Sequence, residues 1–414
     1  MAAMVIVEFS LILAWFWMIG DYDQIRFGVW PMSEWLINYQ GGFVRRGLLG
    51  EVLFQLRPGQ PLIPLLNHLT FYLYAIYCFI FLLIYWLAKI RNSLVLIVAL
   101  LIPGGIFQMA ISASFFTRKE ILFLILFGLL CLLYLRICSL DMQRRRIFIG
   151  AFSLLAIVGG ICLTLIHEAF LFMGFPYVLT LFWVLKAENQ QSAIVRIAFK
   201  VIVITIPTVF LLCTLEHGNV LISQQIWDSL TLSDRLVISP HAPYTVYGAI
   251  GGIGWGKIQN LSTLYGVFAT GGWFYWLFFG LGNYLILGFI LRNFAPADQN
   301  LSKSRFITLL SIPLIASLTM FAIGSDWGRW MASAGNHLIL LAFTLSTSLY
   351  ALTKDNRKIH VWSQSFLKAR FLGGGVFLSG ILIYELIFKM PECCVEFPYI
   401  FIQYRDFVRA VINQ

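Results

Sequence analysis

Long runs of apolar residues alternate with short polar segments along most of this chain. A membrane-spanning helix needs about 20 predominantly apolar residues, because the hydrocarbon core is about 30 Å thick and a helix rises 1.5 Å per residue. The runs show no alternating strand pattern, and lipid offers no partner for unpaired backbone groups, so the runs are expected to be helical. The pattern predicts about eleven spans of this length, at residues 2–20, 61–88, 93–115, 121–140, 147–166, 169–186, 197–215, 270–291, 306–324, 333–352 and 371–389.

Composition supports this interpretation. Of the 414 residues, 60% are hydrophobic and only 12% are charged, and the mean hydropathy is +0.83. A soluble domain carries about 25% charged residues. We therefore expect an all-α, polytopic transmembrane bundle, organised as a single membrane domain over residues 1–414. The first span, 2–20, lacks a basic start and a small-residue cleavage site, so we expect it to be retained and not removed as a signal peptide.

The loop charges predict an orientation. If the N-terminus is cytoplasmic, the inward loops near 89–92, 136–146, 186–200, 292–305 and 353–370 hold 17 Lys and Arg against 4 acidic residues. An excess of Lys and Arg in cytoplasmic loops is the positive-inside pattern. The net charge of +10 therefore reflects topology and contact with anionic membrane lipids, and no basic surface domain indicates a nucleic acid partner.

Unusual polar residues gather in the outward loops of this predicted topology. These loops include a first loop at 21–60 and a long loop at 216–270. They contain Asp21 and Asp23, Arg45 and Arg46 in "GGFVRRGLLGE", Arg118 and Lys119 in "SFFTRKE", His167 and Glu168 in "LIHEAF", and Asp326 and Arg329 in "SDWGRW". The inward loops offer only scattered basic residues. We therefore predict that the functional site lies on the outward face.

These residue types match one kind of chemistry. Arginine presents a planar fork to phosphate oxygens, and a nearby carboxylate or imidazole can take a proton from a hydroxyl group. Transfer of a sugar from a polyprenyl phosphate to an acceptor hydroxyl needs both. We predict that Arg45 and Arg46 bind the phosphate, with flanking glycines that let the backbone approach it. Asp21, Asp23, His167 and Glu168 are the candidate catalytic groups, and the costly location of His167 and Glu168 makes this pair one candidate for the base.

Structural roles remain open for the same residues. Arg45 and Arg46 can be interfacial anchors, and Arg118 and Lys119 have the same alternative. Asp326 and Arg329, at helical spacing, can form a structural ion pair that braces the site. An ionisable pair such as His167 and Glu168, in a short apolar connection, is costly unless it lines a polar cavity.

The long loop at 216–270 carries amphipathic stretches and His241, and we expect an interfacial re-entrant segment that covers the acceptor sugar. Its glycines match no phosphate-binding motif of nucleotide enzymes. The seven cysteines predict no disulfide framework or zinc site, since five lie within expected spans and the other two, Cys393 and Cys394, are adjacent. We expect no cofactor; Asp21 and Asp23 offer only two carboxylates to a divalent metal.

A cytoplasmic N-terminus, "DYD" directly after the first span and a long first outward loop resemble the GT-C class of integral membrane glycosyltransferases. The resemblance implies a polyprenyl-phosphate sugar donor, a glycan acceptor and a base at Asp21 or Asp23. On this basis Asp23 is the favoured base, ahead of Asp21, and His167 and Glu168 orient the acceptor. The arginine-rich outward loops also look like O-antigen polymerases and ligases, which act on polyprenyl-diphosphate sugars. The resemblance thus implies assembly of O-antigen or capsule polysaccharide at the outer face of a bacterial inner membrane, with the repeat-unit polymerase as one form.

Two other classes of function compete with the enzyme. A lipid-linked oligosaccharide flippase or another transporter would place polar residues near the middle of the bilayer, often in two related halves. A non-catalytic assembly subunit would tolerate substitution of the arginines and acids. The polar groups here gather at one surface and the halves show no repeat, which favours the enzyme.

Overall fold

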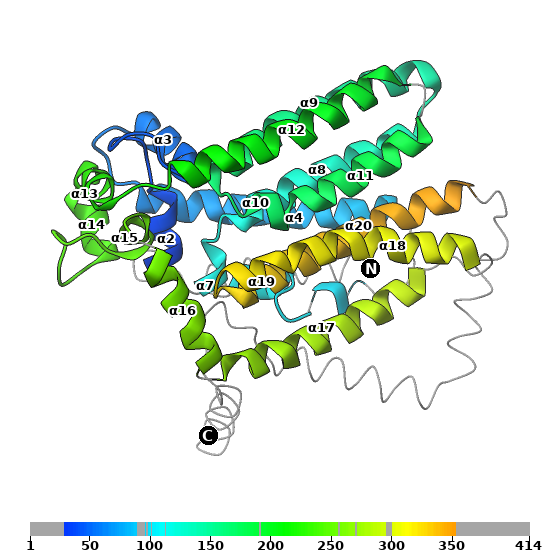
Figure 1. Ribbon diagram of the computed structural model, residues 1–414. Helices are drawn as coiled ribbons and strands as arrows, with labels where there is room; N and C mark the ends of the chain where they lie inside the picture. Colours follow the sequence, from blue (N-terminus) through cyan, green and yellow to red (C-terminus); the bar gives the residue numbers. More distant parts are fainter. Residues whose placement is uncertain are drawn as a thin grey trace. The chain divides into compact units, whose positions relative to one another are not determined.

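The computed structural model describes residues 29–88, 96, 98–100, 102–111, 113–189, 192–255, 257–269, 271–294 and 300–352. Within these ranges the chain is all-helical and has no strand, as the hydrophobic pattern predicts (Figure 1). The expected spans 2–20 and 371–389 lie outside the described residues, as do Asp21 and Asp23.

The chain divides into two compact units. Unit 1 comprises Met1–Leu87 and Met109–Trp255, and unit 2 comprises Ala88–Gln108 and Gly256–Gln414. The expectation of one membrane domain over residues 1–414 stays a prediction. Unit 1 contains α2 (Val29–Trp35), α3 (Gly47–Leu56), α4 (Ile63–Leu87), α7 (Ala113–Phe116), α8 (Glu120–Ser139), α9 (Met142–Ile166), α10 (Phe170–Met173), α11 (Phe175–Glu188), α12 (Ala193–Leu215), α13 (Val220–Ser229), α14 (Leu232–Ile238) and α15 (Gly248–Ile253).

Unit 2 is built from fewer helices. It contains α16 (Lys257–Ala269), α17 (Gly272–Phe294), α18 (Asn300–Ser317), α19 (Thr319–Ile323) and α20 (Trp327–Leu352). The short helix α6 (Ile106–Ile111) lies where the chain passes from unit 2 into unit 1.

Four helices in the described part of the chain are long and apolar enough to cross a membrane. They cover Ile63–Leu87, Glu120–Ser139, Gln143–Ile166 and Ala193–Leu215, all in unit 1. Many apolar side chains on them are exposed, among them Phe79, Leu154, Ile204 and Leu211. Such an outer surface suits contact with lipid, as expected for a membrane-embedded helical protein. The total of about eleven spans stays a prediction.

The long helices of unit 1 place two kinds of loop at opposite ends (Figure 1). Helix α8 packs against α9, and α9 packs against α12. A short turn joins α8 to α9, so the two run antiparallel, and the N-terminus of α8 lies at the same end as the C-terminus of α9. The segments around Lys119 and His167 therefore share one end. The basic segments 136–146 and 186–200 lie at the other end.

Three predicted spans are interrupted. Within 93–115, residues 102–105 are not helical, and the helical residues that follow form α6 and the four-residue α7. Pro103 cannot donate a backbone hydrogen bond, and Gly104 has φ 78°, a conformation that favours glycine. The span 169–186 divides at Gly174 into α10 and α11, and the span 306–324 divides at Leu318 into α18 and α19.

We predict that reporter fusions will reproduce the loop separation. A reporter that is active only outside the cytoplasm should be active when fused after Arg46, Lys119, Glu168 or Arg329, because these loops lack the excess of basic residues that holds a loop inside. Fusions after Arg146, Lys303 or Lys358 should be silent. The reverse pattern at Glu168 and Arg329 would contradict a single functional face.

Candidate functional site

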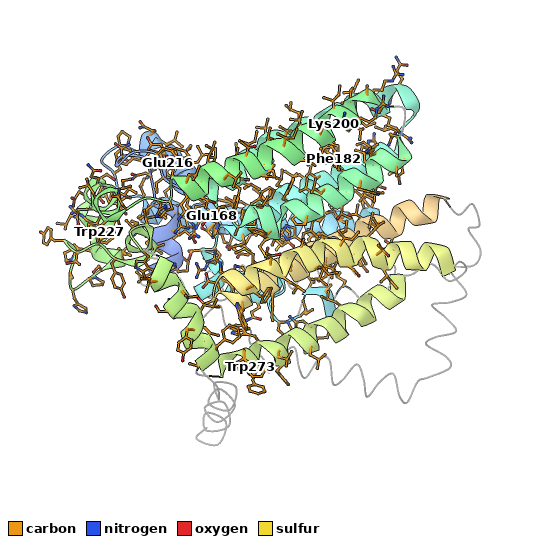
Figure 2. All side chains as sticks on the ribbon, in the orientation of Figure 1. Glu168, Phe182, Lys200, Glu216, Trp227 and Trp273 are labelled. Carbon is orange, nitrogen blue, oxygen red and sulfur yellow. The ribbon has the colours of Figure 1, made fainter. Side chains whose placement is uncertain are left out.

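Eight ionisable side chains from distant parts of the sequence meet at one end of unit 1. We call them the charge cluster: Glu34, Arg45, Arg46, Arg118, Lys119, Glu120, His167 and Glu168. They come from α2, the turn before α3, the start of α8 and the segment between α9 and α10. In Figure 2, Glu168 lies towards the same end of the long helices as Glu216, and Lys200 lies farther along α12.

Glu34 is the centre of the charge cluster. Its carboxylate is fully buried and accepts hydrogen bonds from Arg46 Nη1 at 3.0 Å and Arg118 Nη1 at 3.5 Å. His167 Nε2 lies 3.1 Å from Glu34 Oε1. A buried carboxylate is stable only when paired and hydrogen-bonded, and Glu34 has three partners of this kind. The sequence analysis missed Glu34; an acid inside the apolar stretch "WPMSEWLI" was the available signal.

Packing fixes the short helix that carries Glu34. Ser33 Oγ accepts a hydrogen bond from the Ala249 backbone N–H at 2.8 Å, and the Trp35 indole N–H donates to the Thr117 carbonyl. Residues Pro31 to Trp35 are all buried. These contacts tie α2 both to α15 and to the segment that carries Arg118 and Lys119.

Arg46 has a carboxylate partner at each of its three guanidinium nitrogens. Nε contacts both oxygens of Glu168 at 3.0 and 2.9 Å, Nη2 contacts Glu168 Oε1 at 2.6 Å, and Nη1 contacts Glu34 Oε1. This forked pairing is the strong form of an arginine–carboxylate contact. Arg46 thus connects α2 to the end of α9 and leaves few donors for a ligand.

The backbone of Arg46 is left-handed, with φ 68° and ψ 3°. It is the single non-glycine residue with positive φ in the described ranges. Such a conformation costs a non-glycine residue about 1–2 kcal/mol, so the surrounding contacts must hold it in place. Strain of this kind is typical of functional sites.

Glycines shape the same turn, and mostly through contacts within the protein. A side chain on Gly47 would meet the Tyr39 ring, one on Gly50 would meet the Ile37 carbonyl, and one on Gly41 would meet the Ile222 carbonyl at 2.9 Å. Only Gly42, with φ 109°, faces open space in this group. The glycines therefore let the chain fold closely on itself, which differs from the expected role of close approach to a headgroup.

Arg45 is partly exposed and makes one side-chain contact within the charge cluster. Nη1 contacts Glu168 Oε1 at 3.2 Å, and Nε is buried without a hydrogen-bond partner. The side chain is 22% exposed, so a ligand can reach it. Its backbone N–H donates to the Glu216 carbonyl at 3.1 Å, which ties the turn to the end of α12. Burial lowers the pKa of Arg45, although Glu168 opposes the shift.

Arg118 and Lys119 are buried, whereas Arg45 and Arg46 are partly exposed. Arg118 is 3% exposed and pairs with Glu34. Lys119 is fully buried, and its Nζ donates to the backbone carbonyls of Arg46 at 3.1 Å and Ile166 at 3.3 Å. Burial lowers the pKa of Lys119 to about 8, although Glu34 opposes the shift. Direct contact of Lys119 with a substrate is therefore not supported by this arrangement.

His167 and Glu168 follow the last turn of α9 and are held by their neighbours. The Ala169 N–H donates to His167 Nδ1 at 3.2 Å, which assigns the ring proton to Nε2, next to Glu34. Burial and Arg46 lower the pKa of His167, so the ring is neutral. Burial alone would raise the pKa of Glu168, but the guanidinium groups of Arg46 and Arg45 lower it well below its usual value.

This geometry limits the acid–base chemistry of the pair. A carboxylate that is held by two guanidinium groups is a weak base, because it is already stabilised in its charged form. His167 uses Nδ1 as an acceptor and Nε2 as a donor, so neither nitrogen is available for a hydroxyl proton. Glu168 braces Arg45 and Arg46, and His167 lies between the carboxylates of Glu34 and Glu168. The prediction that they orient an acceptor sugar is untested.

The remaining expected site residues are Asp326, Arg329, His241, Asp21 and Asp23. Asp326 and Arg329, in unit 2, form an ion pair at 2.8 Å with Arg329 buried, which is the structural pairing considered from the sequence. His241 is exposed in the segment between α14 and α15, and no contact joins its side chain to the charge cluster. Asp21 and Asp23 lie outside the described residues.

The first part of the long loop packs onto the same end of unit 1. The buried carboxylate of Asp234 accepts hydrogen bonds from the backbone N–H groups of Leu62 and Ile63, at 3.0–3.1 Å, and so caps the start of α4. Asn38 donates to Ser229 Oγ at 2.9 Å. Helices α14 and α15 therefore lie against α2, which carries Glu34 of the charge cluster, and α13 lies against α15.

The described residues contain no group of three His, Cys, Asp or Glu side chains that could hold a metal ion. The charge cluster has instead four basic side chains against three carboxylates, with His167 neutral. The cluster therefore has one positive charge in excess. Arg45 carries donors that a ligand can reach. The arrangement is thus suited to bind an anion.

A comparison with known protein families, characterised proteins and solved structures found no match.

Proposed function

We propose that this protein is a membrane glycosyltransferase whose donor is a sugar linked to a polyprenyl phosphate or diphosphate. The observation that carries the proposal is the charge cluster at the end of the long apolar helices, with Arg45 open to a ligand. Arg45 binds the donor phosphate. Arg46, Glu34 and Glu168 form the rigid frame that presents it.

The charges support a phosphate ligand. The Arg45 side chain is 22% exposed and contacts Glu168 through Nη1, so its remaining N–H groups can donate two parallel hydrogen bonds to two oxygens of a phosphate. The excess of one positive charge in a poorly solvated site favours an anion more strongly than the same charge in water. An anion that docks here also relieves the cost of the buried, incompletely paired guanidinium.

The surroundings support a donor with a lipid tail. The charge cluster lies at the ends of α8 and α9, and Arg45 contacts the residue that follows α12. Helix α12 carries exposed apolar side chains along its length, including Ile197, Ile204 and Leu211. A polyprenyl chain that lies along such a helix would bring its phosphate to the helix end. The acceptor glycan approaches from the outward face.

The base is proposed from the resemblance to GT-C enzymes. Asp23 or Asp21 takes the proton from the acceptor hydroxyl, since neither His167 nor Glu168 is available for this step. The proposal leaves two forms of the reaction open, transfer of a single sugar and polymerisation of repeat units in O-antigen or capsule assembly.

Transport of a lipid-linked oligosaccharide is the second candidate, and one observation in unit 2 favours it. The interrupted segment at Pro103 and Gly104 has its carbonyls bound by the side-chain amides of Asn283 and Asn336, at 2.8 and 2.9 Å. A cavity beside this segment is lined by Gly104, Asn283, Ser317 and Asn336. Interrupted helices with polar partners are typical of transporter binding sites.

Binding of inorganic diphosphate tests the proposed phosphate site. The purified protein in detergent should bind the anion, and Arg45→Ala should weaken binding about tenfold or more, because a hydrogen bond to a charged group contributes about 1.5–3 kcal/mol. Isothermal titration calorimetry measures the affinity. Arg45→Lys should restore only part of it, since lysine lacks the fork.

A control variant of the same charge distinguishes binding at Arg45 from general attraction by surface charge. Arg57 directly follows α3 and is exposed. It carries the same charge as Arg45 but lies outside the charge cluster, so Arg57→Ala should leave the affinity for diphosphate unchanged. Equal affinity in the wild type and Arg45→Ala would reduce Arg45 to a membrane anchor. Equal losses in Arg45→Ala and Arg57→Ala would point to attraction by net charge alone.

A further inference from the structure

Lys119 occupies an unusual place for a lysine. Its side chain is fully buried, and its ammonium group donates to two backbone carbonyls, those of Arg46 and Ile166. Lysine is rarely buried unless it is paired, and burial of its charge disfavours the folded state. A residue kept at such a cost needs a role that a smaller apolar residue could not fulfil.

The two carbonyls that Lys119 binds belong to the two segments that build the site. Arg46 is the left-handed residue of the turn before α3, and its neighbour is Arg45. Ile166 is the last residue of α9, directly before His167 and Glu168. One ammonium group therefore joins the arginine turn to the end of α9, directly before Glu168, whose carboxylate the arginines bind.

The carbonyl of Arg46 is where this contact matters most. A left-handed residue without glycine's freedom relaxes unless its backbone is held. The side chain of Arg46 is held by Glu34 and Glu168, and the hydrogen bond from Lys119 holds its carbonyl. Fixing this peptide also fixes the direction in which Arg45 leaves the turn.

We propose that Lys119 is a positioning residue that locks Arg46 in its left-handed conformation and so presents Arg45 to the donor phosphate. The role in phosphate binding rests on the proposed function, whereas the lock itself does not. Lys119 acts through the backbone of Arg46 and does not touch the ligand. Lys119 therefore differs in role from Arg45, although both are cations of one cluster.

The segment around Lys119 is well suited to this task. Tyr74 donates to the Phe115 carbonyl at 3.1 Å, its ring stacks on Phe116, and Trp35 binds the Thr117 carbonyl. These contacts fix the backbone on which Lys119 sits. A flexible side chain anchored on a rigid segment can hold a strained turn in one conformation.

A double-mutant cycle at positions 119 and 46 tests the lock through thermal unfolding in detergent. Glycine adopts positive φ without strain, so position 46 needs no lock when it is glycine. Lys119→Met should lower the unfolding temperature by about 2–4 °C or more in the Arg46→Ala background. In the Arg46→Gly background the further loss should be less than half as large. Equal losses in the two backgrounds would overturn the lock.

The second measurement is diphosphate affinity with residue 46 as arginine. Lys119→Met should weaken binding about tenfold, although Lys119 does not touch the ligand. Thr70→Val is the matched control, because it removes a buried hydrogen bond of α4, from Thr70 Oγ1 to the Leu66 carbonyl at 2.8 Å, and leaves Lys119 and Arg46 untouched; its affinity should stay at the wild-type value. Unchanged affinity in Lys119→Met, or an equal fall in Thr70→Val, would overturn the positioning role.

Lys119→Gln provides the test if the methionine variant does not fold. Its amide keeps an N–H donor on a shorter side chain, and it should give an intermediate affinity and an intermediate unfolding temperature. The proposal would be contradicted if Lys119→Gln kept the wild-type affinity for diphosphate while the thermal coupling between positions 119 and 46 was fully lost.

If the wild type itself binds no diphosphate, the proposed function fails. The thermal cycle then still decides whether the lock exists.

Discussion

Replacement of Glu34 by glutamine is expected to lower the free energy of unfolding by about 3–5 kcal/mol, the usual cost of removing one partner from a buried ion pair. Glu34 is fully buried and accepts from Arg46 and Arg118, with His167 Nε2 at 3.1 Å. Glutamine places an N–H₂ group against these donors and leaves the Arg118 charge buried. Thermal unfolding in detergent measures the effect.

A carboxylate of the same region serves as the control. Glu51, on α3, is partly exposed and accepts from the Tyr39 N–H and the side chains of Gln40 and Gln55. Glu51→Gln should cost about 1 kcal/mol or less. Combining Glu34→Gln with Arg118→Met removes both charges and should recover part of the loss. A small effect of Glu34→Gln alone would show that the charge cluster does not organise this end of unit 1.

The second large effect is expected at the proposed base. Asp23→Asn keeps the shape of the side chain and removes its charge, so turnover should fall about 10²-fold or more, the scale of general base catalysis. Binding of the donor phosphate should survive, because it depends on Arg45. A transfer assay with membranes and the native lipid donor measures turnover, with Asp21→Asn assayed in parallel.

Glu168 and His167 supply the contrast for this prediction. Glu168 binds Arg45 and Arg46, and His167 lies between Glu34 and Glu168. Glu168→Gln should therefore lower both stability and donor affinity, whereas Asp23→Asn should lower turnover alone. If Asp21→Asn and Asp23→Asn both keep near-normal turnover while a stably folded Glu168→Gln or His167→Ala variant has none, the base lies in the later loops. The polymerase-like reading would then replace the GT-C-like one.

Hydropathy predicted the long helices of unit 1 closely. Helices α4, α8, α9 and α12 begin and end within a few residues of the expected spans 61–88, 121–140, 147–166 and 197–215. A run of apolar residues is a local property, so the sequence alone contains it. Local breaks are harder to predict, because Pro103 and Gly104 interrupt a helix only where partners such as Asn283 and Asn336 bind the freed carbonyls.

The candidate site was predicted in part. The sequence indicated Arg45, Arg46, His167 and Glu168 as residues of one face, and the structure brings them into contact. It did not indicate Glu34, since the pairing of Glu34 with Arg118 joins positions 84 residues apart. Nor did it separate the roles of Arg45 and Arg46, which follow from how many guanidinium N–H groups of each already bind a carboxylate. Counting these hydrogen bonds requires the positions of the carboxylates in the folded structure.

The most direct test of the proposed function is mass spectrometry of the lipid-linked sugars in cells that lack this protein or carry Arg45→Ala. The account predicts that a sugar linked to a polyprenyl phosphate or diphosphate accumulates in both strains, and that a membrane-impermeant lectin or glycosidase reaches it from outside the cytoplasm. Accumulation on the cytoplasmic side would instead indicate a flippase. An unchanged pool of lipid-linked sugars in both strains would contradict the account.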